Sequence, residues 1–427
     1  MNNLYNSIYT KDLSNKLSFN SLQDDIECDV SIVGGGLTGL SSAIELAEAG
    51  LNVCNLEKDY IGYGASGRNG GHLVQGWSSD FSKIKKNIDK RYHNMAWDAG
   101  IEAVSIVKNR IKRYKINCDL QMGYVYAALS KRQLSELYEM EKEWSHYGYK
   151  HLKILKDRNT IKKFVNTDRY IGGLFDSGSG HLHPMKYLHG LANVAKNLGV
   201  RIFEKTKAIK RLDGKFPVLV TSKNYKIKSS KTLFCGNAYL ENVATKNMTD
   251  KLAPVISSVM ATEPLENDKI KNLIPKNCAI ADCNTALDYY RFDYKHRLIF
   301  GGSSIYSNIS PKDATPSLFK KMTYLFPSLN NIGIEMSWSG RIGITLNRIP
   351  HFGKINDNIY FAQGYSGHGV ALTGLAGKLM AESILNKTNR FEILSEMQHL
   401  SFPGGMFRTP VLVLGMSWFK FKDWLKI

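Results

Sequence analysis

Three glycines near the start of the sequence have a spacing that suits dinucleotide binding. Gly34, Gly36 and Gly39 form the pattern GxGxxG, and the acidic residue Glu57 follows eighteen positions after the last of them. The first glycine permits a tight turn, the second leaves room for a pyrophosphate, and the third lets a helix pack closely on a strand. A carboxylate at the position of Glu57 accepts hydrogen bonds from ribose hydroxyls and disfavours a 2′-phosphate. These residues predict a site for FAD or NAD rather than NADP.

The elements predicted around these glycines have the order that the motif requires. Residues 30–33 predict a strand, 37–49 predict a helix that Gly50 ends, and 51–56 predict a second strand. The start of such a helix presents unpaired N–H groups and the positive end of its dipole to phosphates. A glycine-rich turn in an unrelated α/β protein is the alternative, and the complete strand–turn–helix–strand context disfavours it.

A second glycine-rich loop, 62–71, follows soon after Glu57. It favours FAD over NAD, because such a loop can follow a longer and bulkier cofactor. Ser66 could hydrogen-bond the pyrophosphate, and Arg68 and Asn69 could approach the flavin or its ribityl chain; a surface charge is the alternative for Arg68. The candidate cofactor contacts in this part of the chain are Gly34, Gly36, Thr38, Gly39, Glu57, Lys58, Ser66, Arg68, Asn69, Gly70, Gly71 and Ala208.

A third glycine loop joins a strand predicted over 359–362 to a helix predicted over 370–385. The start of this helix would stabilise the negative charge that a reduced flavin carries near N1 and the C2 carbonyl. His368 either contributes to this site or is an exposed or structural loop residue. The candidate cofactor contacts here are Arg341, Gly364, Gly367, His368, Gly369 and Val370.

Between these loops the pattern changes mainly to strands. Residues 205–235 and 251–345 predict antiparallel strands, with one helix near 316–325, and another helix begins at Pro184. The sequence therefore predicts an α/β fold in which the dinucleotide-binding pieces are separated by a β-rich insertion.

The composition excludes several classes of protein. With 43% apolar and 22% charged residues, the 427-residue chain is globular rather than disordered. No apolar run approaches the roughly 18 residues of a membrane span, and residues 1–20 lack the apolar core of a secretory signal. Six scattered cysteines without a CxxC pair favour free thiols in the cytoplasm and no metal site. The net charge of +19 comes without a nucleic-acid-binding motif, so no nucleic-acid partner is predicted.

Longer stretches of the sequence resemble the D-amino-acid-oxidase-like family of FAD-dependent oxidoreductases, and within it the gamma-glutamylputrescine oxidase branch. The likeness runs from about residue 10 to the end of the chain. Its motifs are specific for the FAD fold and not for the substrate. It is carried by the segments 29–36, 62–71, 286–291, 298–302, 338–345, 364–370, 402–405 and 415–418.

The resemblance implies two domains that alternate along the chain. It implies a discontinuous Rossmann-like FAD-binding domain and an antiparallel-sheet α+β substrate domain that covers the flavin. The expected FAD-binding segments are 26–90, 180–245 and 336–390; the substrate segments are 91–179 and 246–335; a polar leader is 1–25 and a tail packed on the body is 391–427. Relatives with covalent flavin use a cysteine in the C-terminal third. This chain has none after Cys283, so noncovalent FAD is expected.

The resemblance also implies oxidation of a C–N bond in a small amine. Hydride passes to the flavin N5, the imine is hydrolysed to an aldehyde or keto acid and ammonia, and O2 reoxidises the flavin to give H2O2. The flavin carries the chemistry, and no catalytic side chain is assigned, because no Ser-His-Asp set or carboxylate pair is required and none has convincing spacing. Arg291 and Arg341 are candidate carboxylate ligands, and Tyr289 and Tyr290 are a candidate aromatic wall. A structural ion pair is the alternative for either arginine. Core packing is the alternative for one of the two tyrosines, because neighbouring strand residues face opposite ways.

Three functions remain open from the sequence. The first is oxidation of gamma-glutamylputrescine or a similar amine. The second is an FAD-dependent oxidase or dehydrogenase for glycine, sarcosine or a D-amino acid. The third is a noncatalytic FAD-binding or membrane-docking protein, because aromatic and lysine residues mix in 416–427 and such a segment could contact a membrane weakly. Packing of this segment on the body is the alternative.

Overall fold

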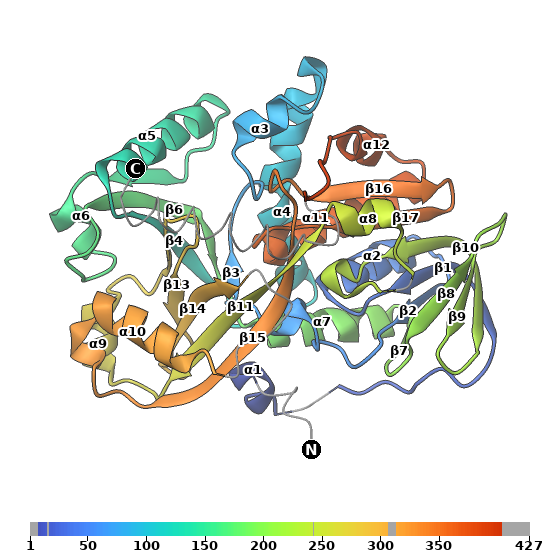
Figure 1. The fold of residues 1–427 in the computed structure, drawn as a ribbon, viewed down its shortest axis with the longest axis horizontal. Coiled ribbons are helices and arrows are strands. Elements are labelled where there is room, and N and C mark those ends of the chain that lie inside the picture. Colours follow the sequence, from blue (N-terminus) through green and yellow to red (C-terminus); the bar gives the residue numbers. More distant parts are fainter. Residues whose placement is uncertain (1–6, 15–16, 242, 306–312, 404–427) are drawn as a thin grey trace.

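The computed structural model describes residues 7–14, 17–241, 243–305 and 313–403. Figure 1 shows two lobes side by side, each built around one β-sheet. The short helix α1 lies below the junction of the lobes, and it contacts α7 of one lobe and β15 of the other.

The first sheet, called sheet A here, has a parallel core in the order β17-β10-β1-β2-β7. Its outer strands are antiparallel, since β16 pairs with β17, and β9 pairs with β10 and β8. All four residues of β2 are buried and apolar or neutral, as expected for a strand covered on both faces. The bounds are β1 Ile26–Val33, β2 Val53–Leu56, β7 Arg201–Phe203, β8 Ala208–Leu212, β9 Val218–Thr221, β10 Lys226–Phe234, β16 His351–Asn356 and β17 Ile359–Gln363.

Four long helices share the largest apolar core with the strands of sheet A. The helices α2 and α11 pack so closely that a Cβ on Gly377 would lie 2.7 Å from the Ser42 backbone nitrogen, so a glycine is required there. The four are α2 Leu37–Glu48, α4 His93–Arg113, α7 Pro184–Asn197 and α11 Gly369–Ile384. Shorter helices of this lobe are α1 Ile8–Lys11, η2 Ala65–Gly67, α3 Phe81–Lys85, η3 Lys90–Tyr92, η4 Asn237–Tyr239, α8 Lys246–Asp250 and α12 Arg390–Ser395.

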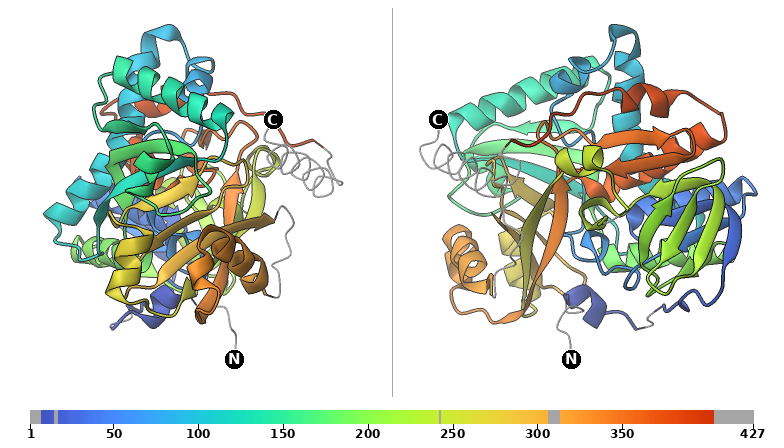
Figure 2. Two further views of the ribbon diagram at one scale, coloured as in Figure 1. Left: turned by 90° about the vertical axis from the view of Figure 1, so that its left-hand side faces the viewer. Right: turned by 45° about the vertical axis from the view of Figure 1, so that its right-hand side comes forward.

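The second sheet, called sheet B, has the order β15-β11-β14-β13-β12-β4-β6-β3, with β5 beside β6. The left view of Figure 2 turns this lobe toward the viewer. Its bounds are β3 His72–Leu73, β4 Gln121–Ala128, β5 Leu152–Leu155, β6 Gly172–His181, β11 Ala253–Thr262, β12 Ala279–Asp282, β13 Tyr289–Phe292, β14 Leu298–Ile305 and β15 Ile334–Ile344. The helices of this lobe are α5 Lys131–His146, α6 Arg158–Lys162, α9 Asn267–Leu273, α10 Thr315–Leu325 and η5 Pro327–Leu329. One face of sheet B packs on α6, α9 and α10, and the other contributes Val259 and Trp338 to the core shared with sheet A.

The predicted helices and strands are confirmed at α2, β2, α7, α10, β17 and α11. Four elements, β3, α4, α8 and β15, lie in the other lobe than the predicted segments place them. The predicted FAD-binding segment that begins at residue 336 contains most of β15, but this strand pairs with β11 along its whole length in sheet B. The predicted substrate segment 91–179 contains helix α4, but this helix packs on α11. Local periodicity identifies a strand or helix, and it does not identify its distant partner.

The N-terminal leader is more tightly packed than its polar composition predicts. Ile8 and Tyr9 of α1 are fully buried. Farther along, the Phe19 N–H donates to Glu204 Oε2 at 3.0 Å, and the Leu22 N–H donates to Thr206 Oγ1 at 3.1 Å. A few apolar residues and backbone N–H groups are therefore sufficient to fix this segment against both lobes.

No helix in the described part of the chain has the length and apolar character of a membrane span. The predicted amphipathic segment 416–427 lies outside the described residues, so its packing stays a prediction. Helix α12, at the start of the predicted tail, packs on β16 and α11. Among the described residues, no group of three or more His, Cys, Asp or Glu side chains could hold a metal ion.

Candidate cofactor and active site

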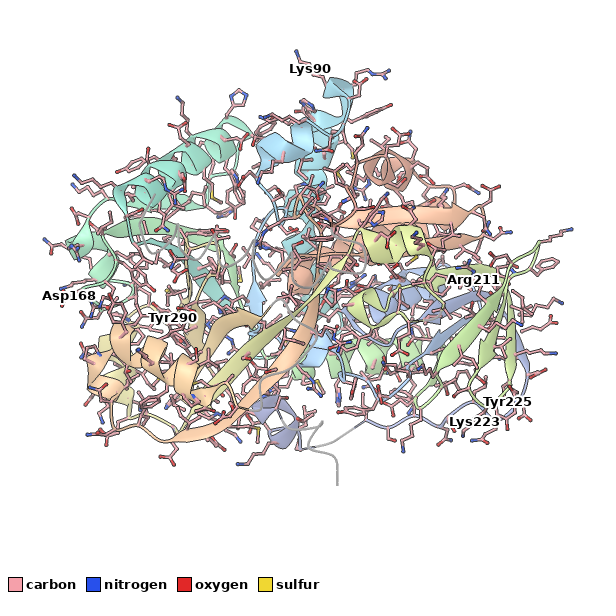
Figure 3. All side chains as sticks on the ribbon, viewed as in Figure 1. Lys90, Asp168, Arg211, Lys223, Tyr225 and Tyr290 are labelled. Carbon is pink, nitrogen blue, oxygen red and sulfur yellow. The ribbon has the colours of Figure 1, made fainter. Side chains whose placement is uncertain are left out.

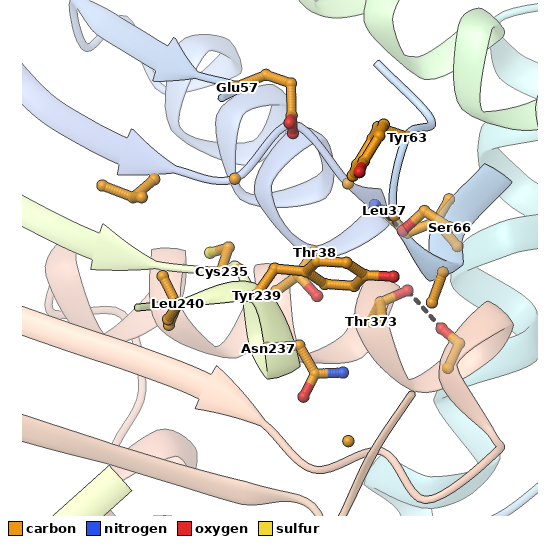
Figure 4. Close-up of a pocket in the computed structure, with 18 of the residues that line it drawn as sticks. Leu37, Thr38, Glu57, Tyr63, Ser66, Cys235, Asn237, Tyr239, Leu240 and Thr373 are labelled. Atoms are coloured by element: carbon orange, nitrogen blue, oxygen red, sulfur yellow. Dashed lines mark hydrogen bonds between the residues drawn. The ribbon is translucent and has the colours of Figure 1, made fainter. Parts of the chain in front are cut away.

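A long pocket lies at the carboxyl ends of the parallel strands of sheet A (Figure 4). Ligands of open α/β sheets bind at this edge. The turn after β1, the loop 62–69, the end of β10, η4 and the start of α11 form its walls. The predicted cofactor contacts that line it are Gly34, Gly36, Thr38, Glu57, Lys58, Ser66, Asn69, Ala208, Gly367, Gly369 and Val370.

The glycines of the first motif have the geometry that a pyrophosphate needs. Gly34 has φ +115°, and a Cβ there would lie 2.9 Å from the Cys235 carbonyl carbon. A Cβ on Gly36 would lie 2.8 Å from Ser66 Oγ, which accepts the Leu37 N–H at 3.0 Å. Gly36 has no side chain to cap α2, and the first residues of the helix, Leu37 and Thr38, line the pocket. This cradle fits the diphosphate of FAD.

Gly39 does not line the pocket. A Cβ at this position would lie 1.9 Å from the Gly34 carbonyl oxygen, so Gly39 brings helix α2 against the end of β1. This close approach is the packing role that the third glycine of the motif predicts.

Glu57 lies at the end of β2 and faces the pocket, as Figure 4 shows. Its Oε2 accepts the Gly35 N–H at 2.9 Å, and its Oε1 accepts the Asp59 N–H at 3.0 Å. Burial raises the pKa of Glu57 to about 7, although these two backbone hydrogen bonds oppose the change. The fixed carboxyl group has free acceptor capacity for ribose hydroxyls.

We expect Glu57→Gln to weaken FAD binding by about tenfold. An amide offers one acceptor oxygen, so one of the two backbone N–H groups or the ribose loses its partner. The FAD dissociation constant, measured by quenching of flavin fluorescence on titration of apoprotein, checks this result. Glu27→Gln, an exposed change in the first half of β1, is the control, and equal FAD affinity of wild type and Glu57→Gln would contradict the assigned contact.

The second glycine loop is tied to sheet B. Asn69 Nδ2 donates to the carbonyls of Ala65 and Ser66 at 3.1 and 2.9 Å, which folds the loop onto itself. Arg68 Nη1 donates to the Ser339 carbonyl at 3.1 Å, and Trp338 Nε1 donates to the Arg68 carbonyl at 2.9 Å. Arg68 therefore lies between the lobes, outside the residues that line the pocket.

Gly70 and Gly71 also do not line the pocket. A Cβ on Gly70 would lie 2.4 Å from the Tyr289 ring, and Gly71 has φ +77° with the Leu182 carbonyl 2.2 Å from an added Cβ. These glycines allow the loop to pass under sheet B. Their predicted contact with the cofactor stays a prediction.

The third glycine loop closes the other end of the pocket through Gly367, Gly369 and Val370. The Tyr365 hydroxyl lies 2.9 Å from Thr38 Oγ1, so this loop contacts the start of α2. Gly364 and His368 are not among the residues that line the pocket. Burial lowers the pKa of His368 to about 4, so its imidazole is neutral near pH 7 and adds no positive charge.

Sequence reasoning missed the contribution of β10. This strand runs parallel to β1 and β17, and the residues after it, Cys235, Gly236, Asn237 and Tyr239, line the pocket (Figure 4). Asn237 Oδ1 accepts the Gly364 N–H at 3.0 Å, which joins this turn to the third glycine loop. The apolar end of β10, Leu233-Phe234, which runs into Cys-Gly-Asn, is the signal that could have found it.

Arg291 is held inside the structure. It is 2% exposed; its Nε donates to the Gly70 carbonyl at 2.7 Å, its Nη1 to the Phe292 carbonyl at 3.2 Å and its Nη2 to the Tyr9 hydroxyl at 3.4 Å. These bonds use all three nitrogens. Arg291 therefore supports the Gly70 loop through carbonyl and hydroxyl partners rather than through the ion pair expected as its structural alternative.

Tyr290 lies in the core of the lobe that carries sheet B (Figure 3). It is fully buried, stacks on Phe300, and donates its hydroxyl to the Tyr170 hydroxyl at 3.0 Å. Its neighbour Tyr289 points the opposite way, as alternation along a strand requires, and its hydroxyl lies 3.3 Å from Ser257 Oγ.

Arg341 lies at the edge of the pocket, next to the lining residue Ile342. Its guanidinium carbon is 5.7 Å from the centre of the Tyr239 ring, and its backbone N–H donates to the Tyr239 hydroxyl at 3.2 Å. Among the described residues its buried Nε has no hydrogen-bond partner. A cation with unused donors at this place can bind an anionic group of a substrate or cofactor.

Comparison with known proteins agrees with this site. The family model described as FAD dependent oxidoreductase (DAO) matches residues 29–383. The chain is 38% identical over 422 residues to a gamma-glutamylputrescine oxidoreductase from Escherichia coli, with 99% of each chain covered. It is also 38% identical over 423 residues to a probable oxidoreductase, OrdL, from Haemophilus influenzae, with 98% of this chain and 97% of the relative covered.

Solved structures share the fold at lower identity. The glycine oxidase from Geobacillus kaustophilus has a TM-score of 0.72 at 20% identity, and covers 88% of this chain and 100% of its own. The L-proline dehydrogenase from P. horikoshii has the same TM-score and identity, with 88% and 96% covered. The glycine cradle, the buried carboxyl group of Glu57 and above all the family and sequence matches lead to one conclusion: the chain belongs to the D-amino-acid-oxidase family of FAD-dependent oxidoreductases, enzymes that oxidise amines and amino acids.

Proposed function

We propose that this enzyme oxidises the primary amine end of gamma-glutamylputrescine or a similar conjugated diamine. The observation that carries the proposal is the 38% identity to a gamma-glutamylputrescine oxidoreductase over 99% of both chains. The proposal includes noncovalent FAD. Cys235, the cysteine among the described pocket-lining residues, has its pKa raised to about 12 by burial, so it is a poor nucleophile near pH 7.

When bound, FAD supplies the acceptor of the hydride from the carbon that bears a neutral amine, and O2 takes the electrons to form H2O2. The chain supplies binding, orientation and shelter from water. Hydrogen bonds of Asn69, Arg68 and Trp338 fix the loop 65–71 between the cofactor pocket and sheet B, so this loop would hold the bound cofactor beside that sheet. The imine of the substrate is then hydrolysed to an aldehyde and ammonia.

Anaerobic bleaching of the flavin with a panel of amines tests the proposal. We expect gamma-glutamylputrescine to bleach the flavin faster than putrescine, glycine, sarcosine or D-alanine. Bleaching by the amino acids but not by the conjugated diamine would favour an FAD-dependent oxidase or dehydrogenase for amino acids. If no amine bleaches flavin that dithionite can reduce, the proposal is wrong.

A carboxylate of the substrate is expected to bind Arg341 and not Arg291. Arg341→Ala should raise KM for gamma-glutamylputrescine by about tenfold to 100-fold and leave KM for n-butylamine unchanged, since only the first substrate has a carboxylate. Arg291→Ala should instead lower the Tm and affect both amines alike, because it removes the support of Gly70. Steady-state kinetics with both amines separates these results. An equal rise of KM for both amines in Arg341→Ala would exclude the carboxylate contact.

A further inference from the structure

Two cysteine side chains meet inside the cofactor lobe. Cys28 lies in β1 and Cys54 in the neighbouring strand β2, and their Sγ atoms are 3.4 Å apart. All six cysteines of the chain belong to the described residues, and no other two of them have sulfur atoms in contact. A disulfide has an S–S length of about 2.0 Å, so the two sulfur atoms need to approach by roughly 1.4 Å.

A bulge in β1 brings the two side chains together. The strand register pairs Cys54 with Ser31, three residues after Cys28. The N–H groups of Asp29 and Val30 both donate to the carbonyl of one residue before β2, at 2.9 and 3.2 Å, so two residues of β1 oppose one residue of its neighbour. Because of this extra residue, Cys28 faces the same apolar cluster as Cys54.

The two thiols differ in their access to solvent. Cys54 is fully buried. Cys28 is half-buried, and its chain neighbours Glu27 and Asp29 are exposed. A small oxidant from the solvent therefore reaches Cys28 first, and Cys54 lies in contact with it as the second thiol.

A buried cation lies beside the pair. Arg201 of β7 is paired with Cys54 across the sheet, and Figure 1 shows β7, β2 and β1 in the same lobe. Its Nη2 donates to the carbonyl of Glu27, the residue before Cys28, at 2.6 Å. The guanidinium thus reaches across β2 to β1, while its buried Nε has no hydrogen-bond partner among the described residues. Reactive cysteines occur in such partly exposed places next to a cation.

The contact between the thiols gives them different roles. The hydrogen bond from Cys54 lowers the pKa of Cys28; burial opposes this effect, and the charge of Arg201 adds to it. The same hydrogen bond and burial raise the pKa of Cys54 well above its usual value. Cys28 is therefore the thiol that ionises, and Cys54 is the thiol that keeps its proton.

We propose that hydrogen peroxide oxidises Cys28 and Cys54 to a disulfide that locks the dinucleotide-binding strand–helix–strand unit. The inference goes beyond the proposed function, since this pair takes no part in amine oxidation. It does connect to it, because reoxidation of the flavin by O2 produces the peroxide. An enzyme with this pair would be stabilised by its own product.

The proposed oxidation has two steps. The Cys28 thiolate attacks one oxygen of the peroxide; an S–O bond forms, the O–O bond breaks, and hydroxide leaves and takes up the proton that Cys28 released. The Cys54 sulfur then attacks the sulfenic sulfur of Cys28; the S–S bond forms, the S–O bond breaks, and the leaving hydroxide takes the Cys54 proton. In total, two thiols are oxidised and one peroxide is reduced to two waters.

The position of the pair explains why the bond would stabilise the lobe without closing the pocket. The disulfide would close the loop 28–54, which contains the first glycine motif and all of α2. A cross-link of this kind restricts the unfolded chain. The cofactor pocket lies at the carboxyl ends of β1 and β2, whereas Cys28 lies in the first half of β1. The oxidised enzyme should therefore keep its FAD.

Peptide mass spectrometry of the holoenzyme tests the proposal. Trypsin cuts after Lys16 and Lys58 and nowhere between them, so Cys28 and Cys54 share one peptide that holds no other cysteine. Reduced holoenzyme is treated with hydrogen peroxide, alkylated and digested. We expect the doubly alkylated peptide to be replaced by an unalkylated form that is two hydrogen atoms lighter and that dithiothreitol restores.

Single variants separate the two roles. Cys54→Ser should stop at the sulfenic acid of Cys28, which dimedone labels, and Cys28→Ser should give no dimedone label in this peptide. Cys283→Ser is the matched control, because Cys283 is also half-buried but contacts no other cysteine among the described residues; it should form the disulfide as wild type does. A wild-type peptide that stays doubly alkylated while other cysteines are oxidised would overturn the proposal.

The Tm of the holoenzyme tests the locking role. Peroxide should raise the Tm of wild type by about 3–6 °C, dithiothreitol should reverse the rise, and Cys28→Ser/Cys54→Ser should show neither change. A disulfide that forms but leaves the Tm unchanged or lowers it would contradict the locking role. Because the peroxide is added, these results do not depend on which amine the enzyme oxidises, so failure of the proposed function would leave them unaffected.

Discussion

Gly36→Val is expected to yield a folded protein without FAD. The added Cβ would lie 2.8 Å from Ser66 Oγ, and the branched side chain would occupy the space between the start of α2 and the second glycine loop. It would also block the N–H groups at the start of α2, because the cradle depends on a bare backbone. We expect at least about 100-fold weaker FAD binding and no detectable amine oxidation.

The ratio of absorbance at 450 nm to that at 280 nm in purified protein measures this effect. Gly214→Ala is the matched control, since nothing lies within 4 Å of an added Cβ there and the residue is exposed. Circular dichroism should show the same helix content in all three proteins. A Gly36→Val protein that retains one FAD per chain would show that the diphosphate does not lie at the start of α2.

Arg297→Met is expected to destabilise the whole molecule by about 3–5 kcal/mol. The Arg297 side chain is 2% exposed and is paired with Asp12 and Asp293, whose side chains are 1% and 3% exposed. A third carboxylate, Glu335 Oε2, lies 3.3 Å from Nη1. Removal of the cation leaves these buried carboxylates without their main partner. Because Asp12 follows α1, the N-terminal leader should leave the body at a lower temperature than the rest of the chain unfolds.

The Tm of the holoenzyme at pH 7 checks this expectation, with Arg132→Met as control. Arg132 is 48% exposed in its pair with Glu136, so its loss should cost about 0.5 kcal/mol or less. Limited proteolysis of the leader should be faster in Arg297→Met than in wild type. Equal Tm values of the two variants would contradict the larger stabilisation expected from the buried ion pairs of Arg297.

Acid should reduce the difference between wild type and Arg297→Met. Burial alone would raise the pKa of Asp12, but hydrogen bonds from Arg297 and Lys295 and their charges outweigh it, so the pKa lies below its ordinary 3.8. A lowered pKa stabilises the folded wild type fully above pH 3.8, and this contribution is lost as pH falls through the lowered pKa. A Tm difference that stays constant down to pH 3 would contradict the role of Asp12.

The first glycine motif was predictable because its chemistry is local. Gly34, Gly36 and Glu57 lie within one strand–helix–strand unit, and local periodicity places them. The end of β10 was not predicted, because the parallel pairing of Val33 with Phe234 joins residues about 200 positions apart. Arg291 looked like a ligand because its type suits a carboxylate. Its actual partners, Gly70 and Tyr9, come from two distant segments that no local pattern connects to it.

The hydroxyl contact between Thr38 and Tyr365 has a consequence for the order of events during synthesis. The first strand of sheet A leaves the ribosome early, but its neighbours β10 and β17 follow only after most of the chain. Pairings between strands so distant in sequence are slow to form, so β1 keeps an unpaired edge until β10 is synthesised. FAD can find a complete cradle only after residue 370 is in place, so capture of the flavin comes late in folding and then stabilises the finished chain.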